Sequence, residues 1–150
     1  MKQSISKNRS AMLPIFFTVF LDLLGLGIVI PILPAVLLNP VTGILPMEVE
    51  YATRTIIYGF LAAAYPLAQL FSSPILGALA DQKGRKKILM ISLLGTFLGY
   101  LIFAIGIYQK NISLLFLGRI IDGLTGGNIT IAQSAISDIS DEKSKPRNFG

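Results

Sequence analysis

Four long apolar segments constrain the fold of this 150-residue chain more than any other feature. They run approximately over residues 11–38, 55–79, 88–107 and 112–136. Each is near the roughly 20 residues that a helix needs to cross about 30 Å of hydrocarbon. Because lipid offers no partners to open backbone groups, each segment is expected to be an α-helix. The sequence therefore predicts an all-α, polytopic membrane domain over residues 1–150 with four transmembrane helices.

The composition agrees with a membrane protein. Hydrophobic residues make up 53% of the sequence and charged residues 14%, and the mean hydropathy is +0.68, whereas soluble domains have about 25% charged residues. The net charge of +5 would suit a nucleic-acid binder, but the charges lie between the apolar segments. With no Cys and no His, the chain lacks the commonest transition-metal ligands and the commonest general base. We therefore expect no nucleic-acid partner, no metal and no cofactor.

The basic residues of the short loops indicate the orientation. One side of the membrane receives ten of them and the other side receives Arg54 and Lys110; the ten are Lys2, Lys7, Arg9, Lys83, Arg85, Lys86, Lys87, Lys143, Lys145 and Arg147. By the positive-inside rule, the side with the excess faces the cytoplasm. The sequence predicts a multi-pass protein of the inner (plasma) membrane, with a cytoplasmic N-terminus and the loop 39–54 outside.

An acid lies in the most basic loop, between the second and third segments. Asp81 precedes Arg85 and Lys86, and the basic side chains suit anionic headgroups. From the residues alone, Asp81 either caps a helix or pairs locally with Arg85. We expect Gly84 to supply a positive φ for the reversal and Gly77 to let the second helix approach a neighbour closely.

Asp22 lies inside the first apolar segment, about ten residues from its cytoplasmic end and thus roughly 15 Å deep. An acid near the midplane costs about 2.5–3.5 kcal/mol on insertion scales, so such acids are functional candidates. We predict that Asp22 is proton-linked. The alternative is a protonated, hydrogen-bonded structural residue.

Polar residues form one stripe along the fourth segment. They recur at spacings of 3, 4, 4, 3 and 4, which places them on one helical face; they are Arg119, Asp122, Gly126, Thr130, Gln133 and Ser137. We predict that Arg119 meets Asp122, one turn away. The pair either only neutralises a buried cation or belongs to a proton-coupling site. Gly123 and Gly127 form a G-x-x-x-G pair suited to close helix contact.

A milder polar stripe runs along the second segment. Its members are Tyr58, Ala62, Tyr65, Gln69 and Ser72. We predict that Tyr58, Tyr65 and Gln69 line one substrate cavity together with Thr130 and Gln133 of the fourth segment.

Three motifs resemble a known family. Gly77-Ala-Leu-Ala-Asp81-Gln-Lys-Gly84-Arg85-Lys86-Lys87 resembles the loop G-x-L-x-D-x-x-G-R-[RK]-x between the second and third helices of the major facilitator superfamily. Leu21-Asp22-Leu-Leu-Gly25-Leu-Gly27-Ile-Val-Ile-Pro31-Ile-Leu-Pro34 resembles the L-D-x-x-G-x-G-x-x-x-P-x-L-P pattern of its twelve-helix drug:proton antiporters. Arg119 and Gly123 match the fourth-helix R-x-x-x-G motif of the superfamily. Gly99 departs from the tetracycline-specific antiporters, which carry an acid there.

The resemblance covers nearly the whole chain and implies the first four helices of a transporter built from two six-helix halves. The implied function is proton-coupled efflux of small amphipathic compounds or drugs, with the lipid bilayer, protons, a small-molecule substrate and the missing C-terminal helices as partners. It also implies a gating loop in which Asp81 meets the N-terminal dipole of a helix in the second half. Arg85 would bridge Asp81 and Asp138.

Two alternatives differ in class from a transporter. The chain is either part of a working exporter or a truncated, non-transporting fragment or assembly partner whose buried charges only pack. A membrane enzyme is not supported, because the sequence offers no nucleophile and base pair and no cluster of metal ligands.

Overall fold

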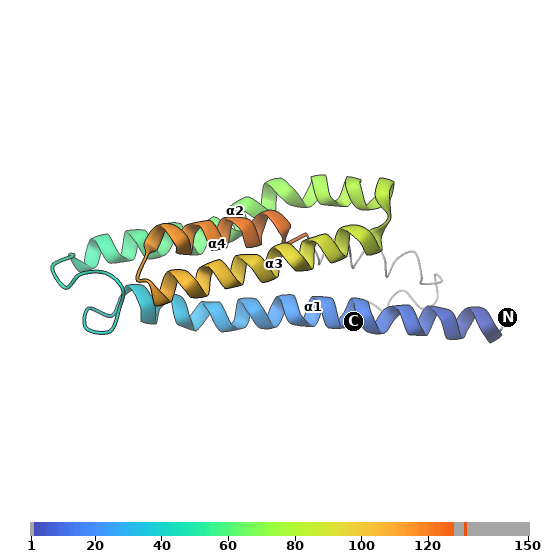
Figure 1. Cartoon of the computed structure of the whole chain (residues 1–150), viewed down its shortest axis with the longest axis horizontal. Coiled ribbons are helices and arrows are strands. Elements are labelled where there is room, and N and C mark those ends of the chain that lie inside the picture. Colours follow the sequence, from blue (N-terminus) through green and yellow to red (C-terminus); the bar gives the residue numbers. More distant parts are fainter. Residues whose placement is uncertain (1, 128–130, 132–150) are drawn as a thin grey trace.

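The computed structural model describes the backbone of residues 2–127 and 131, and side chains from residue 16 onward. The described residues form four helices: α1 (Lys2–Leu37), α2 (Tyr51–Lys83), α3 (Arg85–Tyr108) and α4 (Ile112–Thr125). They run along one long axis (Figure 1). Helix α4 packs mainly on α3 and α2, whereas α1 has fewer contacts with α2. The predicted all-α architecture is confirmed for the described part of the chain.

The short connections agree with the backbone chemistry of their residues. Gly84 alone separates α2 from α3 and has a φ of 92°, as the sequence predicted for a reversal this short. At the other end of α3, the side chain of Asn111 accepts a hydrogen bond of 3.3 Å from the backbone N–H of Leu114 and caps α4. These turns hold α2, α3 and α4 as antiparallel neighbours.

Helix α4 ends at Thr125, earlier than the predicted limit near residue 136. The backbone N–H of Gly126 bonds to the Gly123 carbonyl at 3.2 Å, which is a tighter turn than the α-helical one. Ile131 is again helical, and its N–H donates to the Gly127 carbonyl at 3.1 Å. Gly126 and Gly127 lower the helix propensity at this point. The helix therefore breaks where its helix propensity is low.

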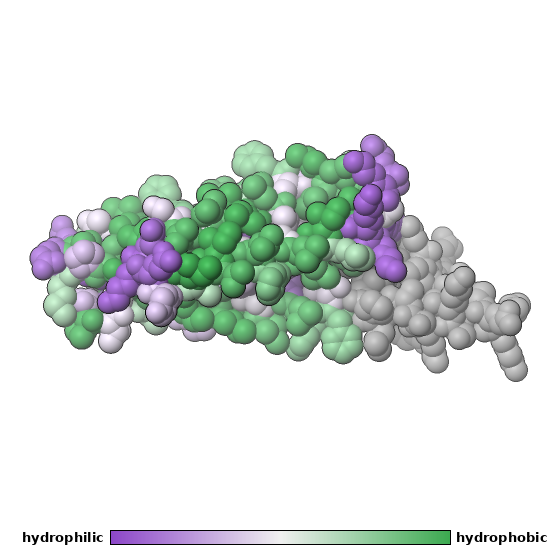
Figure 2. Space-filling view, viewed as in Figure 1, coloured by the Kyte–Doolittle hydropathy of each residue, from purple (hydrophilic) through white to green (hydrophobic). Residues whose placement is uncertain are grey.

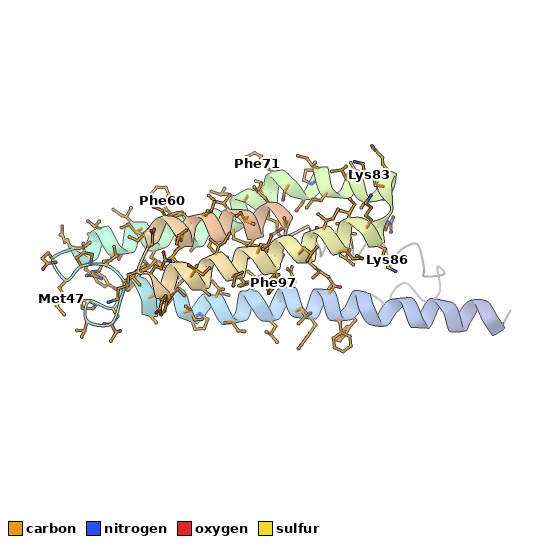
Figure 3. The ribbon with its side chains drawn as sticks, in the orientation of Figure 1. Met47, Phe60, Phe71, Lys83, Lys86 and Phe97 are labelled. Carbon is orange, nitrogen blue, oxygen red and sulfur yellow. The ribbon has the colours of Figure 1, made fainter. Side chains whose placement is uncertain are left out.

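The surface between the two ends of the molecule is apolar. Large hydrophobic side chains such as Phe60, Phe71 and Phe97 are exposed, and Figure 3 shows Phe60 and Phe71 directed away from the bundle. Hydrophilic residues gather at the ends and leave an apolar band between them (Figure 2). By length and composition, α1 from Phe16, α2 and α3 can each cross a membrane. The described part of α4 has 14 residues, which is shorter than a span.

The loop between α1 and α2 is organised by Arg54, which is 1% exposed. Its guanidinium donates to backbone carbonyls of Val49 at 3.0 Å, Leu37 at 3.2 Å, Asn39 and Leu45 at 3.4 Å, and Pro46. The Leu37 carbonyl belongs to the last turn of α1, whose free carbonyls attract a cation. Sequence reasoning counted Arg54 only as a loop charge and missed this role.

Candidate functional site

Besides Arg54 near the loop, three charged side chains are buried among the described residues of the bundle. Asp22 on α1 is 5% exposed, and Arg119 and Asp122 on α4 are 4% and 2% exposed. The Nη1 atom of Arg119 lies 3.1 Å from Oδ2 of Asp122. The predicted pairing of these two residues is therefore confirmed, while the proton-coupling role of all three stays a prediction.

Two tyrosines, on α2 and α3, lie near all three of these charged side chains. Tyr65 on α2 and Tyr100 on α3 each lie within electrostatic range of Asp22, Arg119 and Asp122. The guanidinium carbon of Arg119 is 4.6 Å from the centroid of the Tyr65 ring, a cation–π contact. The hydroxyl of Tyr100 lies where a side chain of Gly25 on α1 would begin. The four helices thus converge on one buried polar group.

Helix α3 approaches α4 closely beside Asp122. A Cβ atom at Gly99 would lie 2.8 Å from Cβ of Asp122 and 2.9 Å from the carbonyl oxygen of Gly118. Such distances leave no room for a side chain at position 99. The departure at Gly99 therefore has a physical reason in this chain, because the space is taken by Asp122.

A cavity of about 320 Å³ lies between α1, α2 and α4, at the lower end of the range for small-molecule sites. Its apolar wall includes Val29 and Leu33 of α1, and Arg119 is the charged residue among those that line it. Of the predicted cavity residues, Tyr58 and Tyr65 line it. A second cavity of about 350 Å³, between α1 and α3, contains Asp22, Thr96 and Tyr100.

The C-terminal members of the α2 stripe form hydrogen bonds to α4 instead of lining the first cavity. Gln69 donates a hydrogen bond from its side-chain amide to the Gly126 carbonyl, and Ser72 donates one of 3.0 Å to the Gly123 carbonyl. Gln69 is not among the described residues that line the 320 Å³ cavity. The remaining predicted cavity residues, Thr130 and Gln133, lie outside the described residues, as does Ser137.

The glycines of α4 allow this close contact with α2. A Cβ atom at Gly123 would meet the Tyr65 carbonyl oxygen and lie 2.7 Å from Cβ of Ala68, and one at Gly127 would lie 2.7 Å from Leu76. The predicted close packing of the Gly123 and Gly127 pair is confirmed. It brings the backbone of α4 onto α2 and so places Arg119 against Tyr65.

The loop between α2 and α3, for which a gating role was predicted, lies at the opposite end of the bundle from Met47, as the labels of Lys83 and Lys86 in Figure 3 show. Arg85 Nη2 and Asp81 Oδ1 are 3.3 Å apart, and the Asp81 side chain is 67% exposed. This is the local ion pair that the residues alone offered, and Lys86 is exposed beside it. Around Gly77, no described atom would lie within 4 Å of a Cβ, so the predicted close approach is not seen there. Asp138 lies outside the described residues.

Comparisons with known proteins agree with the motifs. The sequence profile of the Major Facilitator Superfamily matches residues 15–150. The tetracycline resistance protein of class H from Pasteurella multocida is 41% identical over 143 residues, which cover 95% of this chain and 33% of that protein. The class C protein from Escherichia coli is 38% identical over 144 residues, 96% of this chain and 34% of that protein.

A relative named for a different drug class is also similar. The quinolone resistance protein NorA from Staphylococcus aureus is 36% identical over 137 residues, which cover 91% of this chain and 32% of that protein. The chain thus spans about a third of the length of these curated relatives.

Proposed function

We propose that this chain takes part in transport, because it belongs to the Major Facilitator Superfamily. Together with the remaining helices, we infer that it forms a proton-coupled exporter of small amphipathic compounds or drugs. Relatives named for tetracycline and quinolone resistance support drug efflux. The family consists of transporters, so an enzymatic reaction is not proposed. Residues 1–150 would supply the first four helices, and the missing C-terminal helices would be the partner that completes the central cavity.

The observation that carries the proposal is the buried group of Asp22, Arg119 and Asp122 beside an apolar cavity. Ionised residues inside a membrane domain are costly and mark pathways for protons or substrates. Two carboxylates and one guanidinium leave this group with one excess negative charge. A proton and the basic group of an amphipathic drug would both compensate that charge, and each would therefore disfavour the other. Such competition is what an exchange of drug for protons requires.

The gating loop is proposed to act at the cytoplasmic side. Asp81, Arg85 and Lys86 lie on the connection between α2 and α3, and Gly84 sets its geometry. The Asp81 side chain is 67% exposed although it pairs with Arg85. It is therefore accessible to the N-terminal dipole of a helix from the second half. Contacts of Arg85 with Asp138 and of Gly77 with further helices belong to the same proposal.

We expect an inner-membrane location with the N-terminus in the cytoplasm. The chain has no native Cys, so single Cys substitutions at the exposed residues Glu48 and Lys86 give clean labels. An impermeant thiol reagent applied to intact cells should label position 48 and spare position 86. Permeabilised cells, in which both positions should react, are the control. The reverse pattern in intact cells would invert the topology.

The transport proposal is tested in cells that lack their own exporters. Cells that express the coding sequence read on past Gly150 should accumulate less of a fluorescent quinolone or tetracycline than cells that express residues 1–150 alone, and an uncoupler should remove the difference. Equal accumulation in both, with the longer product present in the membrane, would favour the non-transporting alternative.

A further inference from the structure

Tyr65 touches α4 over two helical turns. Its ring lies against Arg119, with 4.6 Å between the guanidinium carbon and the ring centroid. Its backbone carbonyl occupies the place of a Gly123 side chain, and its hydroxyl would lie 3.0 Å from a Cβ at Gly126. Tyr65 itself is 4% exposed. This one residue of α2 therefore sets where α4 can sit.

The guanidinium of Arg119 has few other described contacts that fix its direction. Nη1 donates to Asp122, and Nε has no hydrogen-bond partner among the described residues. The Tyr100 side chain of α3 is also within hydrogen-bonding range of this guanidinium, so Arg119 has polar neighbours on both α3 and α4. The face of an aromatic ring restrains the plane of a guanidinium that lies over it.

The ring, and not the hydroxyl, makes this contact. The Tyr65 hydroxyl is buried and has no hydrogen-bond partner within the described part of the chain. A phenylalanine would present the same face to Arg119, whereas a leucine would keep apolar volume but present no π face.

Pro66 follows Tyr65 directly and lies inside α2. Proline has no backbone N–H, so the carbonyl four residues earlier loses its helical partner and the helix can bend there. Any bend of α2 at this point moves the Tyr65 ring relative to Arg119.

We propose that Tyr65 is a positioning residue whose ring holds Arg119 turned toward Asp122, so that a bend of α2 at Pro66 changes the Arg119–Asp122 pair. Its consequence for transport rests on the proposed function, but the contact itself does not. The competing role is a direct substrate contact, because Tyr65 also lines the cavity.

A thermodynamic cycle on the purified full-length protein tests the proposal without transport. The thermal unfolding midpoint is measured for Tyr65→Phe and Tyr65→Leu, each in the wild-type background and in the Arg119→Met, Asp122→Leu background. Tyr65→Leu should lower the midpoint clearly in the wild type and much less where Arg119 is absent. Tyr65→Phe should change it little in both. Equal shifts for Tyr65→Leu in the two backgrounds would overturn the proposal.

Tyr58 provides the matched control, since it lines the same cavity and stacks on no cation among the described residues. Tyr58→Leu should lower the midpoint by the same amount in both backgrounds. If Tyr65→Leu does not accumulate, Tyr65→Met takes its place in the cycle.

Transport assays then separate positioning from substrate contact. Tyr65→Leu should shift the pH profile of efflux for every compound tested, and Tyr65→Phe should keep the wild-type profile. A change in KM for some compounds, with an unchanged pH profile, would assign Tyr65 to substrate binding and overturn the positioning role. A thermal cycle that shows the coupling in a protein without transport would instead reject the proposed function and leave the contact standing.

Discussion

Replacing Arg119 alone by Met should abolish efflux and destabilise the protein by about 3–5 kcal/mol, because it leaves Asp122 as an unpaired charge in the bundle. Arg119 and Asp122 are almost fully buried and joined at 3.1 Å. Their remaining polar atoms are poorly satisfied: Arg119 Nε and Asp122 Oδ1 have no hydrogen-bond partners among the described residues. Thermal unfolding of the solubilised protein measures the loss of stability.

The double change Arg119→Met with Asp122→Leu should restore most of that stability. In a buried ion pair with incomplete hydrogen bonding, the attraction between the charges barely offsets the free-energy cost of removing them from water. Apolar replacements of similar volume are therefore often neutral or stabilising. Efflux should nevertheless stay at background, because with Arg119 gone the apolar surroundings of Asp22 favour its neutral, protonated form. The group then keeps no excess negative charge for which a proton and a basic drug could compete. A stable double variant with normal efflux would remove both residues from the site.

Replacing Asp22 by Asn should also reduce proton-coupled efflux to background while the protein remains folded in the membrane. Asn has the shape and hydrogen-bonding capacity of a protonated Asp, but it cannot release a proton. The change also removes the excess negative charge of the group, so neither a proton nor a basic drug gains from binding there. Drug movement down its own gradient should persist, since Asp22 is not among the described residues that line the 320 Å³ cavity.

Ser92→Ala is a matched control for Asp22→Asn. Ser92 on α3 is fully buried, and its hydroxyl has no hydrogen-bond partner among the described residues, so its removal should leave efflux unchanged. Drug-dependent proton movement and downhill drug flux are both measured in everted vesicles. Wild-type coupling in Asp22→Asn would assign this residue to structure.

The sequence predicts the features of this fold that depend on local chemistry. Hydropathy finds the apolar helices because lipid leaves few alternatives to a helix. The positive φ of Gly84 follows from the shortness of the turn, and the pairing of Arg119 with Asp122 follows from helical spacing alone. Each of these features needs only neighbours along the chain.

Features that depend on how helices pack are not visible in the sequence. The stripe of α2 is correctly placed on one face, but nothing in its residues says that Gln69 and Ser72 bond to carbonyls of α4 while Tyr58 and Tyr65 face the cavity. The sequence places Arg54 at the end of a loop, whereas the structure places it in the first turn of α2, where five backbone carbonyls surround its guanidinium. The early end of α4 has one weak local signal, the two glycines at 126 and 127.

We propose that the buried group of Asp22, Arg119 and Asp122 couples drug movement to protons, and everted vesicles test this coupling directly. Everted vesicles that contain the full-length protein are acidified inside by respiration, and the inner pH is followed with a quenched fluorescent amine while drug is added. We expect drug to dissipate the pH difference in the wild type and to have no such effect in the stably folded Arg119→Met, Asp122→Leu variant. Equal dissipation by wild type and double variant would contradict it.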